Sequence, residues 1–545
     1  MKKIKINLIY LFSFILIISC DSTELNLTED PNGASPSDAN VSLLLNGAMI
    51  NFKNFNKELT DFGMQVTRMT HMSGPVYDNA YTPQSFNDLW EEAYAGVLAD
   101  TKIIIAKGIK EKMFNHVAIA KILQSYVLTS LVDMFGDVPY SESILFTENF
   151  NPKADDDKDI YMIALNLLKE AINDFNKTSL KGLEKGDDIF YYGNVTKWES
   201  LANTLQLRLY NNMRLSDPNT AAINTLIAGG KLILASNDDF QISYRTQNND
   251  PDLRHFKFKD NYLSDDKDYM SNYFMNLLKN GKSVEDPRLH YYFYRQTLTY
   301  PDPSTSDGLF TLPCLGESKP LHYAFNDPFC NIGNGYWGRD HGNNDGGPPD
   351  GGKVTVWGLY PAGGKYDNNE GSSVGKNDGA KGKGIYPIWN SANTNFLLAE
   401  SALTLGTSGN AKEYLENGIK ESMSKVRNFN KGAIPSGTTL PTDANVTSYI
   451  KEVLTKYDAA NDSEKLNIIM TESYIANWGN GLEVYNAYRR TSKPSNLQPT
   501  ISATPGVFIR SFMYPGNFAN LNSSVSPKSG NNIKIFWDLN ADNLN

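Results

Sequence analysis

Cysteine and histidine are scarce in this chain of 545 residues, which has three Cys and six His. No two of the histidines have the spacing of a helical HExxH zinc motif. A glycine-rich phosphate loop between a strand and a helix is also missing. The sequence therefore singles out no catalytic centre, no metal centre and no cofactor.

Basic tracts are missing as well, and the formal net charge is −10 (51 basic against 61 acidic residues). This balance argues against nucleic acid or an anionic membrane surface as the main partner. Aromatic residues are plentiful, with 30 Tyr, 26 Phe and 7 Trp. Some of them must lie at the surface, where aromatic side chains are typical of binding sites.

The N-terminus has the pattern of an export signal. Three lysines precede an apolar run at Leu8–Ile18, which is too short to span a bilayer. The following Ile-Ile-Ser-Cys resembles a bacterial lipobox, which predicts removal of residues 1–19 and a lipid on Cys20. The alternative is an ordinary signal peptide with an incidental cysteine. Residues 20–40 are polar, with two prolines, and are expected to form a tether.

The two remaining cysteines, Cys314 and Cys330, are 16 positions apart. In an exported chain such a pair indicates a disulfide, with two free thiols as the alternative. The predicted bond would brace the base of the segment at 334–352, NGYWGRDHGNNDGGPPDGG.

Hydrophobic periodicity predicts a largely helical chain. Helices are expected at 86–107, 116–134, 160–175, 197–215, after Asp217-Pro218 as far as Gly229-Gly230, 393–405, from Asn410 onward, and 465–488. Residues 288–296 are short and aromatic, which predicts a strand. Residues 299–383 are rich in Gly, Pro, Asn and Asp and are expected to be irregular. Paired helices suggest tetratricopeptide-like hairpins.

Five motifs in order resemble the signature of SusD/RagB-type lipoproteins, in particular the SusD-like 2 subgroup. They are Asp133–Glu142 (DMFGDVPYSE), Tyr192–Leu209 (YGNVTKW…LAN…LRL), Phe396–Glu400 (FLLAE), Gly481–Pro494 and Tyr514–Asn522. Asn194 replaces the usual Asp, Ser492 replaces a Gly, and the last motif lacks its Glu.

The resemblance implies a mainly α fold, with four tetratricopeptide-like hairpins as a scaffold and long irregular loops with a few short strands as the binding side. It implies one domain at 41–545, with a loop-rich insertion at about 299–383. It also implies a cell-surface lipoprotein of the Bacteroidota outer membrane that acts as a lid on a TonB-dependent (SusC-like) transporter. Such a protein captures oligosaccharide or, alternatively, peptide. A lipoprotein glycosidase and a structural repeat scaffold stay open, because the abundant carboxylates could include a glycosidase pair.

Candidate ligand contacts lie in two loop patches, where aromatic faces could stack on sugars and polar groups could bind hydroxyls. They are Tyr336, Trp337, Arg339, Asp340, Trp357 and Tyr360 in one patch, and Tyr77, Asp78, Asn79 and Tyr81 in the other. The alternative is that an Arg–Asp pair and a tryptophan fasten an irregular loop to the body. A calcium loop at His341, Asn343 and Asp345 is a weaker alternative.

Other conspicuous residues are expected to be structural. Trp90, Tyr94, Tyr161 and Trp198 lie on helical stripes and predict core packing. Arg208 and Glu400 lie in otherwise apolar helices, where a buried charge needs a partner, so ion pairs are expected there rather than catalysis.

Overall fold

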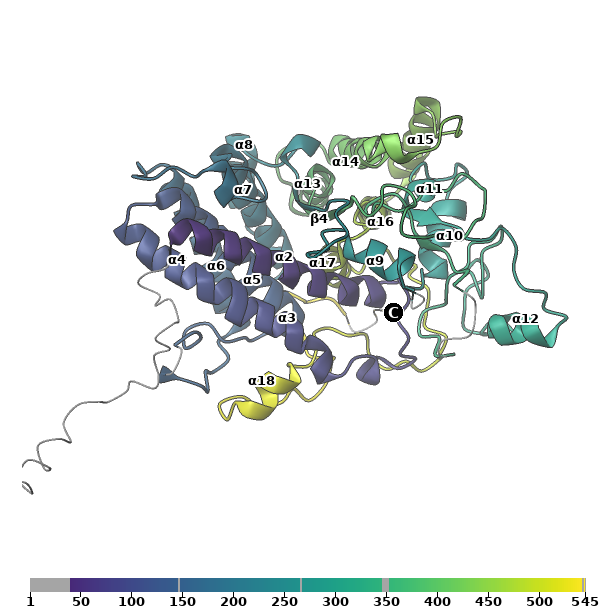
Figure 1. Ribbon diagram of the computed structural model, residues 1–545, viewed down its shortest axis with the longest axis horizontal. Coiled ribbons are helices and arrows are strands. Elements are labelled where there is room, and N and C mark those ends of the chain that lie inside the picture. Colours follow the sequence, from purple (N-terminus) through teal and green to yellow (C-terminus); the bar gives the residue numbers. More distant parts are fainter. Residues whose placement is uncertain (1–39, 146–147, 265–266, 346–351, 542–543, 545) are drawn as a thin grey trace, which may run out of the picture. The chain divides into compact units, whose positions relative to one another are not determined.

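The computed structural model describes residues 40–145, 148–264, 267–345, 352–541 and 544. The predicted signal peptide, Cys20 and all but the last residue of the tether lie outside the described residues. Val41–Asn545 forms one compact unit. Most of its regular structure is helical, which confirms the mainly α prediction (Figure 1).

The first half of the unit contains α2 to α8 and a π-helical turn, η3. Their bounds are α2 Val41–Val66, α3 Asn87–Glu91, η3 Glu92–Leu98, α4 Ala99–Lys110, α5 Phe114–Phe135, α6 Asp157–Phe175, α7 Val195–Asn212 and α8 Thr220–Gly229. Asn194 accepts a hydrogen bond from the amide of Lys197 and so caps α7. The departure from the usual Asp therefore keeps an N-cap at this position.

The second half has shorter helices near its start and a second helical group at its end. Their bounds are α9 Phe256–Tyr262, α10 Asn272–Asn280, α11 Leu289–Tyr292, α12 Ser306–Thr311, α13 Ser391–Leu405, α14 Ala411–Asn428, α15 Asp443–Ala459, α16 Asp462–Ala476, α17 Gly481–Thr491 and α18 Gly516–Leu521. The strands are β1 Phe240–Ser243, β2 Phe293–Tyr294, β3 Val356–Trp357 and β4 Ile385–Trp389. They form two antiparallel pairs, β1 with β4 and β2 with β3.

Consecutive long helices pack as hairpins, α5 with α6 and α13 with α14, while the N-terminal α2 packs on the C-terminal α17. A Cβ on Gly63 would lie 2.1 Å from the carbonyl oxygen of Gly481, so the contact between α2 and α17 depends on glycine. Helix α5 is long and apolar enough to cross a membrane, but it is buried within the fold. Its composition is that of a core helix.

The motifs of the sequence meet in buried ion pairs. Arg208 lies 2.8 Å from Asp133 and 2.7 Å from Glu483, nitrogen to oxygen. Glu400 binds both Arg214 (2.9 Å) and Arg490 (2.7 Å). The prediction of ion pairs for Arg208 and Glu400 is therefore confirmed, and these motifs contribute to the interior rather than to a reaction centre.

Two element predictions were wrong. Residues 465–488 are not one helix, because Asn477–Asn480 separates α16 from α17 and Gly479 has a φ of +95°. Residues 288–296 are not one strand, because α11 occupies the first part and only Phe293 and Tyr294 pair in β2. Apolar or aromatic residues recur on both sides of each change, so periodicity alone did not place it, although Gly479, Asn480 and Gly481 mark the first break in the sequence.

Candidate functional site

The two sequence-predicted loop patches lie against each other. The amide of Gly342 donates to the carbonyl of Met72 (2.9 Å), and His71 Nε2 lies 2.9 Å from the carbonyl oxygen of Asn343. The Tyr77 hydroxyl lies 3.4 Å from His341 Nε2. Residues 71–81 and 334–345 therefore form one structure, the loop junction, although about 260 positions separate them in the sequence.

Most of the predicted ligand contacts are inside the protein. Seven of the ten are at most 8% exposed, namely Tyr77, Tyr336, Trp337, Arg339, Asp340, Trp357 and Tyr360. Their side chains fill the space beneath the irregular backbone rather than forming an exposed aromatic platform, which favours the alternative that they fasten the loop to the body. Asp78 and Asn79 are exposed and Tyr81 is partly buried.

Trp337 fills a small core under the loop junction. This core also contains both half-cystines of the Cys314–Cys330 disulfide, which confirms that pairing, and Val354 and Val356. The Trp337 amide donates to the Thr355 hydroxyl (2.8 Å). Backbone and side chain together fasten residues 334–345 to the strand that contains Val356.

Arg339 and Asp340 face different partners. The Arg339 guanidinium lies 3.9 Å from the ring centroid of Tyr269, a cation–π contact. Asp340 accepts hydrogen bonds from the Cys330 amide (2.7 Å) and from Gln498 Nε2 (3.3 Å). Burial raises the pKa of Asp340 to about 6. Its carboxyl group therefore ties three separate loops together in the interior.

Trp357 and Tyr360 are also part of the core. Trp357 stacks on Trp478 with ring centroids 4.1 Å apart, and its Nε1 donates to Asp268 Oδ2 (3.0 Å). Tyr360 stacks on Tyr292 at 5.7 Å. Trp478 comes from the break between α16 and α17, so this aromatic stack joins the loops to the helical scaffold.

Asp78 and Asn79 are exposed and Tyr81 is partly buried, and Tyr269, a partly buried residue next to the junction, contacts His71 and Arg339; we call these four residues the polar rim. Sequence reasoning missed Tyr269, because it lies among charged residues (Asp265–Asp268) with no aromatic neighbour to signal it. The hollow next to Tyr269 measures about 20 Å³, which is room for about one water molecule. The described residues therefore offer a surface at this rim rather than an enclosed pocket.

Two further residues expected in the core, Trp90 and Tyr94, are only partly buried. They line an open cavity of about 580 Å³ together with Phe518 of α18. The prediction of core packing is confirmed in part, because both side chains pack against the core, Trp90 on the buried Phe135 with ring centroids 5.5 Å apart, while they also face the cavity. Tyr161 and Trp198 are fully buried, which confirms their prediction.

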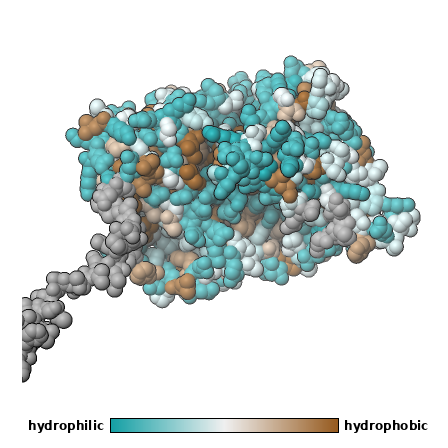
Figure 2. All heavy atoms as spheres, viewed as in Figure 1, coloured by the Kyte–Doolittle hydropathy of each residue, from teal (hydrophilic) through white to brown (hydrophobic). Residues whose placement is uncertain are grey.

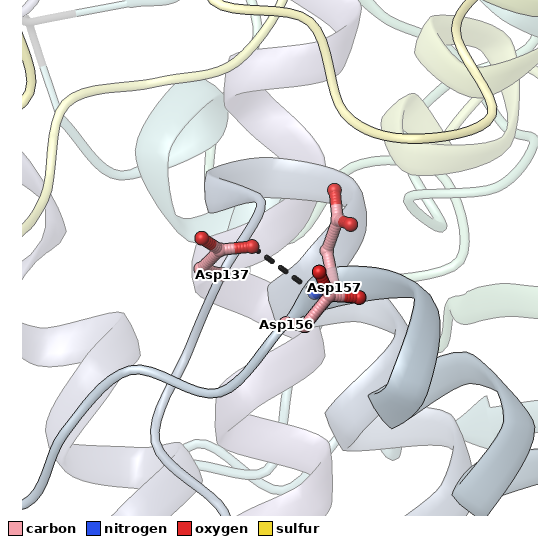
Figure 3. A group of neighbouring side chains, drawn as sticks. All are labelled: Asp137, Asp156 and Asp157. Atoms are coloured by element: carbon pink, nitrogen blue, oxygen red, sulfur yellow. Dashed lines mark hydrogen bonds between the residues drawn. The ribbon is translucent and has the colours of Figure 1, made fainter.

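Three carboxyl groups that could hold a metal ion come together at the start of α6, namely those of Asp137, Asp156 and Asp157 (Figure 3). Backbone amides bind all three: Asp137 accepts from Asp157 (3.0 Å), Asp156 from Lys158 (3.0 Å) and Asp157 from Phe536 (2.8 Å). Burial raises the pKa of Asp157 to about 6. Helix capping and loop anchoring account for these contacts.

The weaker calcium alternative falls at the loop junction. His341 is buried against Tyr77, and Asn343 Nδ2 donates to Asp345 Oδ2 (2.6 Å). Burial lowers the pKa of His341 well below its ordinary value, so this side chain is neutral at physiological pH. Residues 346–351, where the rest of a calcium loop would fall, lie outside the described residues.

Comparison with known proteins gives consistent relatives. The family model described as "Starch-binding associating with outer membrane" (SusD-like_2) matches residues 32–307, and "Susd and RagB outer membrane lipoprotein" (SusD-like) matches residues 369–533. A comparison with curated proteins gives no match.

Solved structures share the fold over most of the chain. A SusD/RagB family protein from Bacteroides thetaiotaomicron VPI-5482 has a TM-score of 0.67 at 16% identity, over 92% of this chain and 100% of that one. A chitin-binding SusD homologue from Flavobacterium johnsoniae has a TM-score of 0.60 at 19% identity, over 92% and 99%. A protein described as chitin-binding has a TM-score of 0.64 at 21% identity, over 92% and 100%. The chain belongs to the SusD/RagB family of outer-membrane lipoproteins.

Proposed function

We propose that this protein is a lipid-anchored, surface-exposed binding protein. It captures an oligosaccharide and passes it to a TonB-dependent, SusC-like transporter in the outer membrane. The observation that carries the proposal is family membership through a starch-binding family model over residues 32–307. Two solved relatives described as chitin-binding support a glycan ligand.

The polar rim of the loop junction is the proposed contact surface for the glycan. Asp78 and Asn79 are exposed and offer a carboxylate and an amide, which suit sugar hydroxyls. Tyr81 and Tyr269 add partly exposed aromatic rings. The buried residues beneath the rim, Trp337 and Asp340 among them, then position the surface without touching the ligand.

Calorimetry on the mature chain tests this proposal with a panel of chitin-type, starch-type and other oligosaccharides and of peptides. For a glycan that binds, Asp78→Ala should weaken affinity about tenfold or more, because a hydrogen bond to a charged group contributes about 1.5–3 kcal/mol. Asp159→Ala, an exposed aspartate on α6, is the matched control and should leave affinity unchanged.

Three outcomes would contradict the proposal. Binding of peptides alone would favour a peptide-import protein. Release of shortened sugars during the assay would identify a glycosidase. Unchanged affinity in both Asp78→Ala and Asn79→Ala would move the glycan away from the polar rim.

A further inference from the structure

An apolar cavity opens between the π-helical turn and the C-terminal helix α18. Its inner wall consists of Trp90, Tyr94 and Phe518, with ring centroids 4.8 Å apart for Trp90–Tyr94 and 4.5 Å for Trp90–Phe518. The rest of the apolar lining is Ala95, Ala99, Pro139, Ile144, Leu145, Phe150, Pro152 and Leu521. Figure 2 shows hydrophobic side chains at the surface near α18, toward the lower left of the view.

Three polar side chains around this cavity already have partners. The Tyr94 hydroxyl donates to the Pro139 carbonyl (2.7 Å), and Asn522 Nδ2 donates to the Pro152 carbonyl (2.7 Å). Asn149 Nδ2 donates to Glu142 Oε2 (3.3 Å). The wall therefore offers apolar contact rather than free hydrogen-bonding groups, which suits hydrocarbon side chains better than sugar hydroxyls.

The rim of the cavity exposes large apolar side chains. Phe150 is 74% exposed and Leu521 is 78% exposed, and both line the cavity. Large exposed apolar side chains beside an apolar hollow mark an interaction surface.

An acidic hollow of about 420 Å³ borders the same helical turn. Its charged lining is Glu58, Asp88, Glu91 and Glu92. Lys57 pairs with Glu58 at 2.9 Å, which leaves an excess of negative charge. Ala95 lines both the acidic hollow and the apolar cavity, so the two adjoin at this residue.

The π-helical conformation of η3 places these two chemistries side by side. A π-helix holds extra residues per turn, and such turns are frequent at functional sites. Here the turn follows directly on α3, which supplies Trp90 and Glu91, and itself supplies Glu92 and Tyr94. The aromatic residues line the apolar cavity and the two glutamates line the acidic hollow.

We propose that this face binds a segment of another protein in which large apolar side chains stand next to lysine or arginine. The apolar side chains enter the cavity between Trp90 and Phe518, and the basic side chains lie over the acidic hollow. A lipid acyl chain would leave the acidic hollow unused, and a glycan would leave the apolar wall without hydrogen bonds. This docking face is separate from the polar rim and does not depend on the proposed glycan.

Two synthetic peptides test the proposal with the mature chain. Both contain the same Leu and Phe residues, flanked by Lys in one and by Glu in the other, and binding is followed by fluorescence anisotropy. We expect the Lys peptide to bind at least tenfold more tightly than the Glu peptide. Added salt should lower the affinity of the Lys peptide, because the carboxylates that attract it are partly exposed.

Exposed residues provide variants that leave folding intact. Phe150→Ser and Glu91→Lys should each lower the affinity for the Lys peptide at least fivefold without changing the melting temperature. Phe310→Ser on α12, also an exposed phenylalanine, and Asp159→Lys on α6 are matched controls and should bind like the parent chain.

Several results would overturn the docking proposal. These are a Kd for the Lys peptide weaker than about 1 mM, equal affinity for both peptides, or no effect of Phe150→Ser and Glu91→Lys. Binding of a monomeric alkyl maltoside that Phe150→Ser abolishes, with no peptide binding, would assign the cavity to an acyl chain. Concentration-dependent dimerisation lost in Phe150→Ser would assign the face to a second copy. Loss of glycan affinity in Phe150→Ser would show that the docking face and the polar rim belong to one glycan site.

Discussion

At the scale of single residues, the loop junction shows how irregular backbone is held in place. A loop without repeating hydrogen bonds needs specific side chains to fill the space beneath it and to bind its amides. Trp337 supplies volume, and Asp340 accepts a backbone amide from Cys330. The same residue types are typical of ligand platforms, so composition could not separate the two roles. Burial does separate them.

Trp337→Ala should lower the free energy of unfolding by about 3–5 kcal/mol, because it empties the small core beside the disulfide. Chemical denaturation of the purified mature chain measures this change. Phe325→Ala is the control, since Phe325 is 97% exposed and its removal should have little effect. An unchanged stability in Trp337→Ala, combined with a lower ligand affinity, would instead show that this residue contacts the ligand.

Asp157→Asn should change how stability depends on pH. Burial raises the pKa of Asp157 to about 6, so the folded state binds a proton that the unfolded state has already lost. This contribution is fully present below the unfolded pKa of about 4 and is lost as the pH rises through about 6. The asparagine variant lacks it, and its oxygen can still accept the Phe536 amide.

Melting temperatures at pH 4 and pH 7.5 measure this effect. The variant should gain stability relative to the parent chain on going from the lower to the higher pH. Asp159→Asn, an exposed neighbour on α6, should follow the parent chain. If Asp157→Asn and the parent chain change their melting temperatures equally between the two pH values, Asp157 is not the source of this pH dependence.

At the scale of elements, hydrophobic stripes predicted the long helices α5, α6, α7 and α13 well, because each buries one or more faces in a common core. Caps were also readable, since Asn410 accepts from the amides of Lys412 and Glu413 as expected. The prediction ran α16 and α17 together, because it followed the apolar positions on both sides and passed over Gly479-Asn480-Gly481, where the chain turns. Helix α2 was not placed at all, although it contacts α17 across the whole sequence.

The candidate site was less predictable than the fold. Both loop patches could be singled out by composition, but their contact could not, because it joins segments about 260 positions apart. The cavity at Trp90 and Tyr94 was missed, since the conformation of η3 has no sequence signature. The third aromatic residue of its inner wall, Phe518, comes from the opposite end of the chain.

Gly479 is the element-scale test of the break between α16 and α17. Its φ of +95° is one that other residues rarely adopt, and an added Cβ would lie 3.0 Å from Pro361. Gly479→Ala should therefore cost about 1–3 kcal/mol of stability. Gly432→Ala is the matched control, because no atom lies within 4 Å of its Cβ position. Equal melting temperatures for the two variants would contradict this explanation.

At the scale of the whole molecule, the lipobox and the helical fold are both features of the family to which the chain belongs. A lipid on Cys20 would anchor the chain to a membrane without spanning it. The anchor sits in the part of the chain that the structure does not describe, so its evidence is the sequence pattern alone.

Cys20→Ala should abolish metabolic labelling with a fatty acid and release the protein from the membrane fraction. Cys314→Ser is the control and should remain labelled, because its sulfur belongs to the predicted and observed disulfide. Continued labelling of Cys20→Ala would place the lipid elsewhere. Protease treatment of intact cells tests surface exposure separately, and an untouched protein would contradict it.

The buried ion pairs have a consequence for how the protein is made. Arg208, near the middle of the chain, meets Asp133 and also Glu483, and Glu400 meets Arg490. A chain that ends before residue 481 would keep only the Arg208–Asp133 and Glu400–Arg214 pairs, and both buried networks would lack their C-terminal members, however complete the earlier helices are. Nascent or truncated chains should remain substrates for proteases until the last hundred residues have been synthesised, so that quality control in the cell acts on the C-terminus of this protein.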